Sequence, residues 1–180
     1  MPVSGEILFG LDEKGALVDE ITLDLAGGEG VLKFFNNFSE DVGIKSFNLL
    51  GRSNSDFSSL QIDRLSIGTL GPDLSLKGKI QRNLANNKSY INIEFEKITP
   101  SELAYVYPGL EKLGGLELPL SGALAFNIDE HGSLVKAIDF DLTSEGGHLN
   151  FPDLFPTRAN VSLFQMRGSS TIDLSIVNIE

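Results

Sequence analysis

Apolar and polar residues alternate along most of this chain, in short runs that end at glycine, asparagine or aspartate. A period of two residues is typical of a β-strand with one apolar and one polar face. The alternation predicts strands at 6–11, 17–25, 31–35, 43–51, 59–67, 74–80 and 89–97, and again in the last third of the chain. The run at 89–97 is the clearest, because Ile91, Ile93 and Phe95 alternate with polar residues. The chain is therefore predicted to be mostly β.

Turns and one helix are predicted between these strands. Residues 12–15 are predicted to form a tight hairpin turn in which Asp12 bonds its own backbone, and 27–30 to turn the chain again. Thr99 is a suitable helix N-cap, with Pro100 in the first helical position and Glu102 where a capping box would need it. This helix is expected to end near Tyr107, to break at 108–109 and to be followed by a helical turn at 110–113.

The start of the chain reappears 117 residues later. Residues 2–34 align without gaps with 119–151, and 15 of the 33 aligned positions are identical. The same offset still pairs Phe47 with Phe164 and Gly51 with Gly168. A tandem repeat predicts stacked copies of one structural unit. We therefore expect a first β unit at 1–97, a helical linker at 98–117 and a second, partial β unit at 118–180, in one continuous sheet.

Two architectures would accommodate such strands. In a closed β-sandwich or barrel the apolar faces seal one another, whereas a curved open sheet would leave its apolar face as a groove for lipid. Burying a 16-carbon acyl chain is worth roughly 12 kcal/mol, at about 0.8 kcal/mol per CH₂, so a protein that carries lipid through water needs a continuous apolar surface. The residue pattern alone favours the sandwich.

Composition narrows the possible functions. Apolar residues make up 41% and charged residues 22% of the chain, which is typical of a globular protein. The net charge of −11 disfavours binding to nucleic acid and to anionic lipid headgroups. The absence of cysteine excludes disulfides and thiol catalysis. No secretory signal opens the chain and no apolar run is long enough to span a membrane.

Few residues of the sequence are candidates for catalysis or for binding a metal or an anion. His131 and His148, the two histidines, have no carboxylate or serine at a spacing that suggests catalysis. Asp139 and Asp141 lie on one strand face, but a calcium site needs six or more oxygen ligands and no loop supplies them. The glycine clusters at 27–30 and 145–147 lead into strands rather than a helix N-terminus, so they are interpreted as turns. The sequence thus predicts no enzyme, no cofactor and no metal site.

Several motifs follow one another in the second half of the chain. They are Pro-Gly-Leu at 108–110, Leu-Pro-Leu-Ser-Gly at 118–122, an acidic hairpin at 129–132, Asp-Phe-Asp-Leu at 139–142, Gly-Gly at 146–147 and an edge segment at 149–156. In this order they resemble a recurrent segment of the AsmA-like proteins of Gram-negative bacteria, above all the YhdP-type branch. With its first copy included, the resemblance covers about two thirds of the chain.

The resemblance implies an elongated, curved (taco-like) β-sheet whose interior is a hydrophobic groove, as in bridge-like lipid transfer proteins. It implies transport of phospholipid between the inner and outer membranes, a periplasmic location and a role in outer-membrane biogenesis and cell-envelope maintenance. It also implies that this chain is an internal segment of a longer protein whose membrane anchor lies elsewhere. The rival function is a structural or adhesive β-sandwich that binds protein or glycan through its loops.

The residues of the expected apolar face are the candidates for contact with phospholipid or another acyl lipid. In the first copy they are Ile7, Phe9, Leu11, Leu17, Ile21, Leu23 and Leu25; in the second copy Leu124, Phe126, Ile128, Leu134, Ile138, Phe140 and Leu142; and between the copies Ile91, Ile93 and Phe95. The same residues would form the sealed core of a sandwich.

Overall fold

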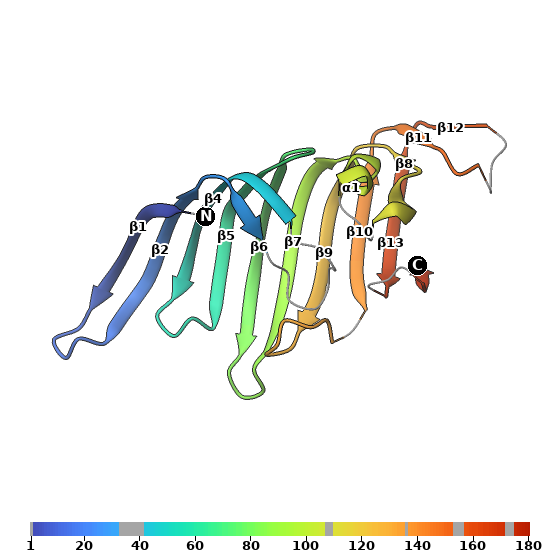
Figure 1. Cartoon of the computed structure of the whole chain (residues 1–180). Coiled ribbons are helices and arrows are strands. Elements are labelled where there is room, and N and C mark those ends of the chain that lie inside the picture. Colours follow the sequence, from blue (N-terminus) through green and yellow to red (C-terminus); the bar gives the residue numbers. More distant parts are fainter. Residues whose placement is uncertain (1, 33–41, 107–109, 136, 153–156, 172–174) are drawn as a thin grey trace.

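The computed structural model describes residues 2–32, 42–106, 110–135, 137–152, 157–171 and 175–180 (Figure 1). The predicted strand end at 33–35, the helix end at Tyr107, the break at 108–109 and the last part of the 149–156 motif lie outside these residues.

Strands dominate the described residues, as predicted. They are β1 (Val3–Leu11), β2 (Leu17–Gly27), β3 (Gly30–Leu32), β4 (Val42–Asn54), β5 (Ser59–Thr69), β6 (Leu74–Asn83), β7 (Lys88–Ile98), β8 (Leu116–Glu117), β9 (Leu120–Ile128), β10 (Ile138–Ser144), β11 (Gly147–Leu149), β12 (Ala159–Val161), β13 (Phe164–Ser170) and β14 (Val177–Ile179). The predicted helix is α1 (Pro100–Val106), and a 3-10 turn, η1 (Glu111–Leu113), follows it.

Eleven of these strands form one large antiparallel sheet with open edges. Its order is β1-β2-β4-β5-β6-β7-β9-β10-β13-β14, with β3 attached to β4, so β1 and β14 lie at the two ends (Figure 1). The only other sheet of the described chain has three short strands, in the order β12-β11-β8. The predicted curved, open, mostly β sheet is confirmed. The alternative, a closed β-sandwich, is wrong, because the described strands form a sheet that neither closes on itself nor packs against a second sheet of comparable size.

The tandem repeat is visible in the strands. β1 and β9 have the same bounds once the offset of 117 is applied, and so do β3 and β11. The pair Gly30↔Ile44 between β3 and β4 returns as Gly147↔Val161 between β11 and β12. The two copies differ in one respect, because β4 of the first copy is continuous whereas its counterpart in the second copy is divided into β12 and β13. The division separates the second copy's short strands from the large sheet.

The start of β10 also differs from its counterpart in β2. The repeat predicts a strand from Leu134 onward, but Leu134 forms only an isolated bridge with Ile128, and β10 begins at Ile138. The amide of Val135 still donates to the carbonyl of Asn127. The second hairpin is therefore held together beyond its tight turn, although its return strand is not regular there.

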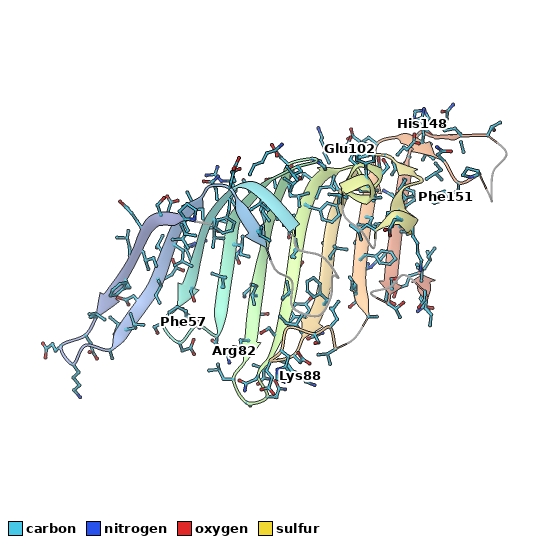
Figure 2. The ribbon with its side chains drawn as sticks, viewed as in Figure 1. Phe57, Arg82, Lys88, Glu102, His148 and Phe151 are labelled. Carbon is cyan, nitrogen blue, oxygen red and sulfur yellow. The ribbon has the colours of Figure 1, made fainter. Side chains whose placement is uncertain are left out.

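Both predicted aspartate turns are present. The Oδ1 atom of Asp12 accepts hydrogen bonds from the backbone amides of Lys14 and Ala16, and Oδ1 of Asp129 accepts from His131 and Ser133. These turns and the tip of the β6–β7 hairpin, near Arg82 and Lys88, lie at one end of the strands (Figures 1 and 2). Helix α1 and the small sheet lie at the other end, where Glu102 and His148 are labelled.

A glycine recurs in every second strand of the large sheet, next to the strand that follows it in the sheet order. A Cβ atom at each of these glycines would run into a backbone carbonyl oxygen of that neighbour. The pairs are Gly5 with Asp24, Gly51 with Gln61, Gly78 with Asn92, Gly122 with Asp141 and Gly168 with Asn178. Interior glycines of this kind are sites where a strand bends and a second backbone approaches closely.

The close approach at Gly78 predicts a loss of stability for Gly78→Ala. Because the added methyl group would displace the backbone of Asn92 on β7, we expect the free energy of unfolding to fall by about 1–3 kcal/mol. Gly28→Ala is the matched control, since a Cβ there meets no atom within 4 Å, and it should change stability by less than about 0.5 kcal/mol. Urea unfolding followed by circular dichroism measures both. Equal stabilities of the two variants would contradict the close approach.

The Asp129 turn predicts a dependence of stability on pH. Backbone hydrogen bonds from Ser133 and then His131 lower the pKa of Asp129 below its usual 3.8. A lowered pKa in the folded state contributes stability above the unfolded value, and this contribution is lost as the pH falls through the folded value. Asp129→Ala should therefore lower Tm more at pH 7 than at pH 2. Asp129→Asn keeps an acceptor oxygen and should show little pH dependence; a pH-independent effect of Asp129→Ala would contradict the assignment.

Candidate functional site

The strand register brings apolar residues of neighbouring strands opposite one another. Residues that are directly opposite in an antiparallel pair project to the same side of a sheet. Followed from strand to strand, such pairs form a row that crosses all ten strands of the sheet order. This central row consists of Ile7, Leu23, Gly51, Ile62, Gly78, Ile93, Leu124, Phe140, Gly168 and Ile179. It contains no polar side chain.

A second row runs beside the central row on the same side. It consists of Gly5, Leu25, Leu49, Leu65, Leu76, Phe95, Gly122, Leu142 and Met166, each directly opposite the next. This row also lacks polar side chains. The side of the sheet that carries both rows is called the apolar face below, and the other side the polar face.

The residues predicted as lipid contacts all belong to the apolar face. Most of them lie in the two rows or directly alternate with row members along a strand, as Phe9 does between Ile7 and Leu11. Leu17 is opposite Leu11, and Leu134, although outside a regular strand, is opposite Ile128. The register thus joins side chains from both copies of the repeat and from β7 into one surface.

Strands β4, β5 and β6 contribute apolar-face residues that the sequence-based selection missed. They are Phe47, Leu49, Leu60, Ile62, Leu65, Ile67, Leu74, Leu76 and Ile80. The sequence pattern could have identified these residues, because their strands were predicted and their apolar residues also alternate with polar ones. It was obscured in β5, where a bulge between Ile62 and Leu65 shifts the alternation by one residue.

Burial differs sharply between the two faces. Ile21, Ser53, Phe140 and Ser170, all on the apolar face, are at most 8% exposed. Across the described part of the large sheet, no residue of the polar face is buried. The apolar face is therefore the more shielded side of the curved sheet. Towards the β1 edge this shielding ends, since Ile7, at 53%, and Phe9 are more than half exposed.

The total surface is large for the size of the protein. The accessible surface is 11452 Å². A compact protein of 19.5 kDa is expected to expose about 8,500 Å², so this chain exposes roughly a third more. Such an excess is expected of an open sheet that forms a single layer in the described part of the chain.

Charged residues are found on the polar face, where several form ion pairs. The guanidinium of Arg52 lies 3.1 Å from an Asp63 oxygen and 3.7 Å from Glu20, and these carboxylates raise the pKa of Arg52. Lys77 lies 3.9 Å from Glu96. These pairs are exposed, so each contributes little to stability. They make the polar face suited to contact with water.

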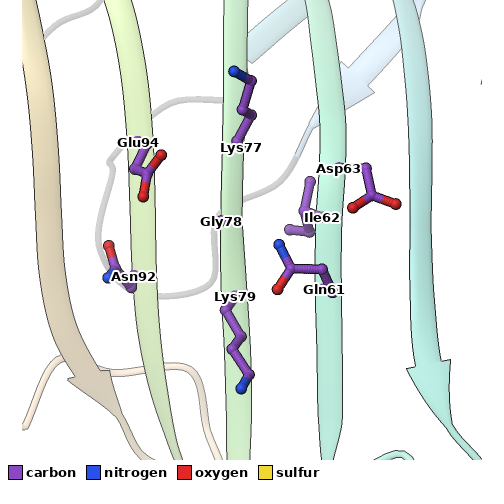
Figure 3. A pocket seen from close by; sticks show the side chains of 8 residues that line it. All are labelled: Gln61, Ile62, Asp63, Lys77, Gly78, Lys79, Asn92 and Glu94. Atoms are coloured by element: carbon purple, nitrogen blue, oxygen red, sulfur yellow. The ribbon is translucent and has the colours of Figure 1, made fainter.

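A hollow of about 240 Å³ lies on the polar face, over β5, β6 and β7 (Figure 3). Gln61, Lys79 and Asn92, which are neighbours across these strands, line it together with Lys77 and Glu94. The Oδ1 atom of Asn92 is buried and has no hydrogen-bond partner among the described residues. Among the described residues, no serine, cysteine or histidine lines this hollow.

The other residues considered for chemistry do not form a cluster of three or more among the described residues. Asp139 and Asp141 lie on the polar face opposite Ser169 and Arg167, and the described residues contain no group of three or more potential metal ligands. His131 lies in the hairpin turn beside Glu130, and its side chain is 74% exposed. His148 lies in β11, opposite Glu117 and Asn160.

Comparison with known proteins adds no relative. No family model, no curated protein and no solved structure matches this chain. Among the described residues, no helix has the length and apolar character needed to cross a membrane. The site that stands out is therefore defined by geometry alone: an apolar face that crosses the whole sheet.

Proposed function

We propose that this chain binds the acyl chains of phospholipid along its apolar face. In this proposal it forms a stretch of a bridge-like lipid-transfer surface in the envelope of a Gram-negative bacterium, with the periplasm as its location. The observation that carries the proposal is the central row, in which apolar side chains and glycines follow one another across ten strands without a polar interruption.

The length of the central row suits an acyl chain. Adjacent strands are about 4.8 Å apart, so ten strands give a row of about 43 Å. The hydrocarbon core of a bilayer is about 30 Å thick and holds two acyl chains end to end, so one chain needs about 15 Å. The row therefore has room for more than one acyl chain along its length, which is a requirement for a surface along which lipids move.

The exposure of the apolar face also supports lipid binding rather than the role of a sealed core. A sealed core leaves little apolar surface in water, yet at the β1 end of the sheet the apolar-face residues Ile7 and Phe9 are more than half exposed. An acyl chain gains about 0.8 kcal/mol for each CH₂ removed from water. An apolar face that water can reach would provide this gain without a deep pocket.

Glycan binding has less support. Sugar-binding surfaces rely on exposed aromatic side chains, but the chain contains no tryptophan and only three tyrosines. Two of these, Tyr90 and Tyr105, are exposed on separate elements, β7 and α1. They do not form a common platform for a sugar ring.

Lipid bound to the purified chain is the direct test of the proposed function. The chain produced in bacteria and studied by native mass spectrometry should carry adducts with the masses of phospholipids, and solvent extraction should recover the same lipids. Protein that remains free of lipid after incubation with phosphatidylethanolamine and phosphatidylglycerol vesicles would contradict the proposal.

The apolar face can be altered at Leu76, which lies in the middle of the sheet between Leu65 and Phe95. A carboxylate at this position would be buried against an acyl chain without a partner, so Leu76→Asp should reduce bound lipid about tenfold or more. Ser75→Asp places the same charge on the polar face of the same strand, where Ser75 is exposed, and should leave lipid binding unchanged. Circular dichroism checks that both variants fold.

A further inference from the structure

A second hollow lies at the tip of the β6–β7 hairpin, apart from the hollow over the middle of β5, β6 and β7. Its volume is about 460 Å³. The residues that line it are all polar, and they include Arg82, Asn83, Asn86 and Lys88 but no aspartate or glutamate. The charge of this lining is opposite to that of the whole chain, which has 25 acidic and 14 basic residues. The hollow is therefore suited to an anion.

The register of the hairpin brings its two cations to the same end of the sheet. Asn83 of β6 is directly opposite Lys88 of β7, and Arg82 is opposite Ser89. Figure 2 shows Arg82 and Lys88 at this tip. Among the described residues, neither of the two cations forms an ion pair with a carboxylate. Both charges are therefore available to a bound anion.

Two asparagine side chains at the tip are oriented by the backbone. The Oδ1 atom of Asn83 accepts a hydrogen bond from the amide of Ala85 at 3.0 Å, and Oδ1 of Asn86 accepts from the amide of Lys88 at 3.1 Å. A backbone N–H can only donate, so these bonds fix which end of each side chain is the oxygen. The Nδ2 groups, which can only donate, are then left for an acceptor from outside the turn.

The same turn holds the guanidinium of Arg82. Its Nη2 atom donates to Oδ1 of Asn87 at 3.1 Å. A guanidinium has five N–H groups in a planar fork, which matches two oxygens of a phosphate group. One contact with Asn87 therefore positions Arg82 and leaves most of its donors for a ligand.

Arg82 also lies at the border of the apolar face. Along β6 this face is apolar from Leu74 to Ile80, and the next residue on the same side is Arg82. On β7 the face ends likewise at Ile91, which is followed on that side by Ser89. A positive charge thus stands directly beyond the last apolar residue of β6.

We infer that the tip of the β6–β7 hairpin binds a phosphate ester. Arg82 and Lys88 neutralise its charge, and the Nδ2 groups of Asn83 and Asn86 donate to its oxygens. Phosphate oxygens accept hydrogen bonds, and all four of these groups are donors. The inference does not rest on lipid binding by the apolar face, because the four groups belong to the hairpin tip. Where lipid is bound, the phosphate is that of its headgroup; otherwise it is that of a soluble ester.

The neighbouring hairpin turn places a competing carboxylate near Lys88. Backbone hydrogen bonds from Ser133 and then His131 lower the pKa of Asp129, and the charges of His131 and Lys88 lower it further. A bound phosphate has to share Lys88 with this carboxylate. Asp129→Asn keeps an acceptor oxygen for the turn and removes the charge, so it should tighten phosphate binding by about twofold. Weaker binding by this variant would contradict the role of Lys88.

Titration with sn-glycerol 3-phosphate tests the site, with glycerol as the uncharged control. In ¹⁵N–¹H NMR spectra the phosphate should shift the amide signals of residues 82–90 saturably, and glycerol should not. Arg82→Gln and Lys88→Gln should each raise Kd about three- to tenfold. Lys14→Gln is the matched control, because Lys14 lies in the hairpin turn between β1 and β2 at the same end of the sheet, and it should leave Kd unchanged. Absence of saturation, equal shifts with glycerol, or an equal loss in Lys14→Gln would overturn the inference.

Lipids distinguish the two sources of phosphate. Phosphatidylglycerol and diacylglycerol have the same acyl chains, but only the first has a phosphate. If the headgroup is the ligand, Arg82→Gln should reduce bound phosphatidylglycerol about threefold or more in native mass spectra and leave bound diacylglycerol unchanged. Leu76→Asp, on the apolar face, should reduce both lipids.

The remaining outcomes separate this site from the apolar face. Binding of glycerol phosphate at the tip, with phosphatidylglycerol unaffected by Arg82→Gln, assigns the site to soluble phosphate esters. Loss of both lipids in Arg82→Gln, with glycerol phosphate binding unchanged, would overturn the site. A chain that binds neither lipid contradicts the proposed function of the apolar face, and the titration with glycerol phosphate then decides the present inference by itself.

Discussion

The register of the antiparallel pairs is the constraint on which the rest of this structure depends. A shift of one residue in any pair would turn a strand's apolar side chains to the polar face. The bulges keep the faces separate. Ile62 and Leu65 are three residues apart, as are Phe95 and Ile98, yet a bulge between each pair returns both residues to the apolar face. In each case the apolar residues are spaced for the bulge, so sequence and register agree.

The glycines of alternate strands add a second constraint. In the central row, Gly168 lies opposite Phe140, and in the second row Gly122 lies opposite Phe95. Each of these glycines thus has a large aromatic residue opposite it on the same face, an arrangement known to compensate for a glycine in a bent strand. These glycines allow both the bend of the strand and its close approach to the next strand, since a side chain at either glycine would push the neighbouring backbone away. Curvature and lipid contact are consequently coupled in the proposed function.

Much of this fold was predictable from local pattern, because alternation and turn residues act within a few positions. The strands from β1 to β7, helix α1 and the Asp12 and Asp129 turns were expected. The open sheet was not favoured by pattern, since the same alternation of Ile91, Ile93 and Phe95 would serve a sealed core. The division of β12 from β13 and the irregular start of β10 at Leu134 were also missed. The open sheet depends on pairing between segments that are far apart in the sequence, such as β7 with β9, and periodicity does not report such pairing.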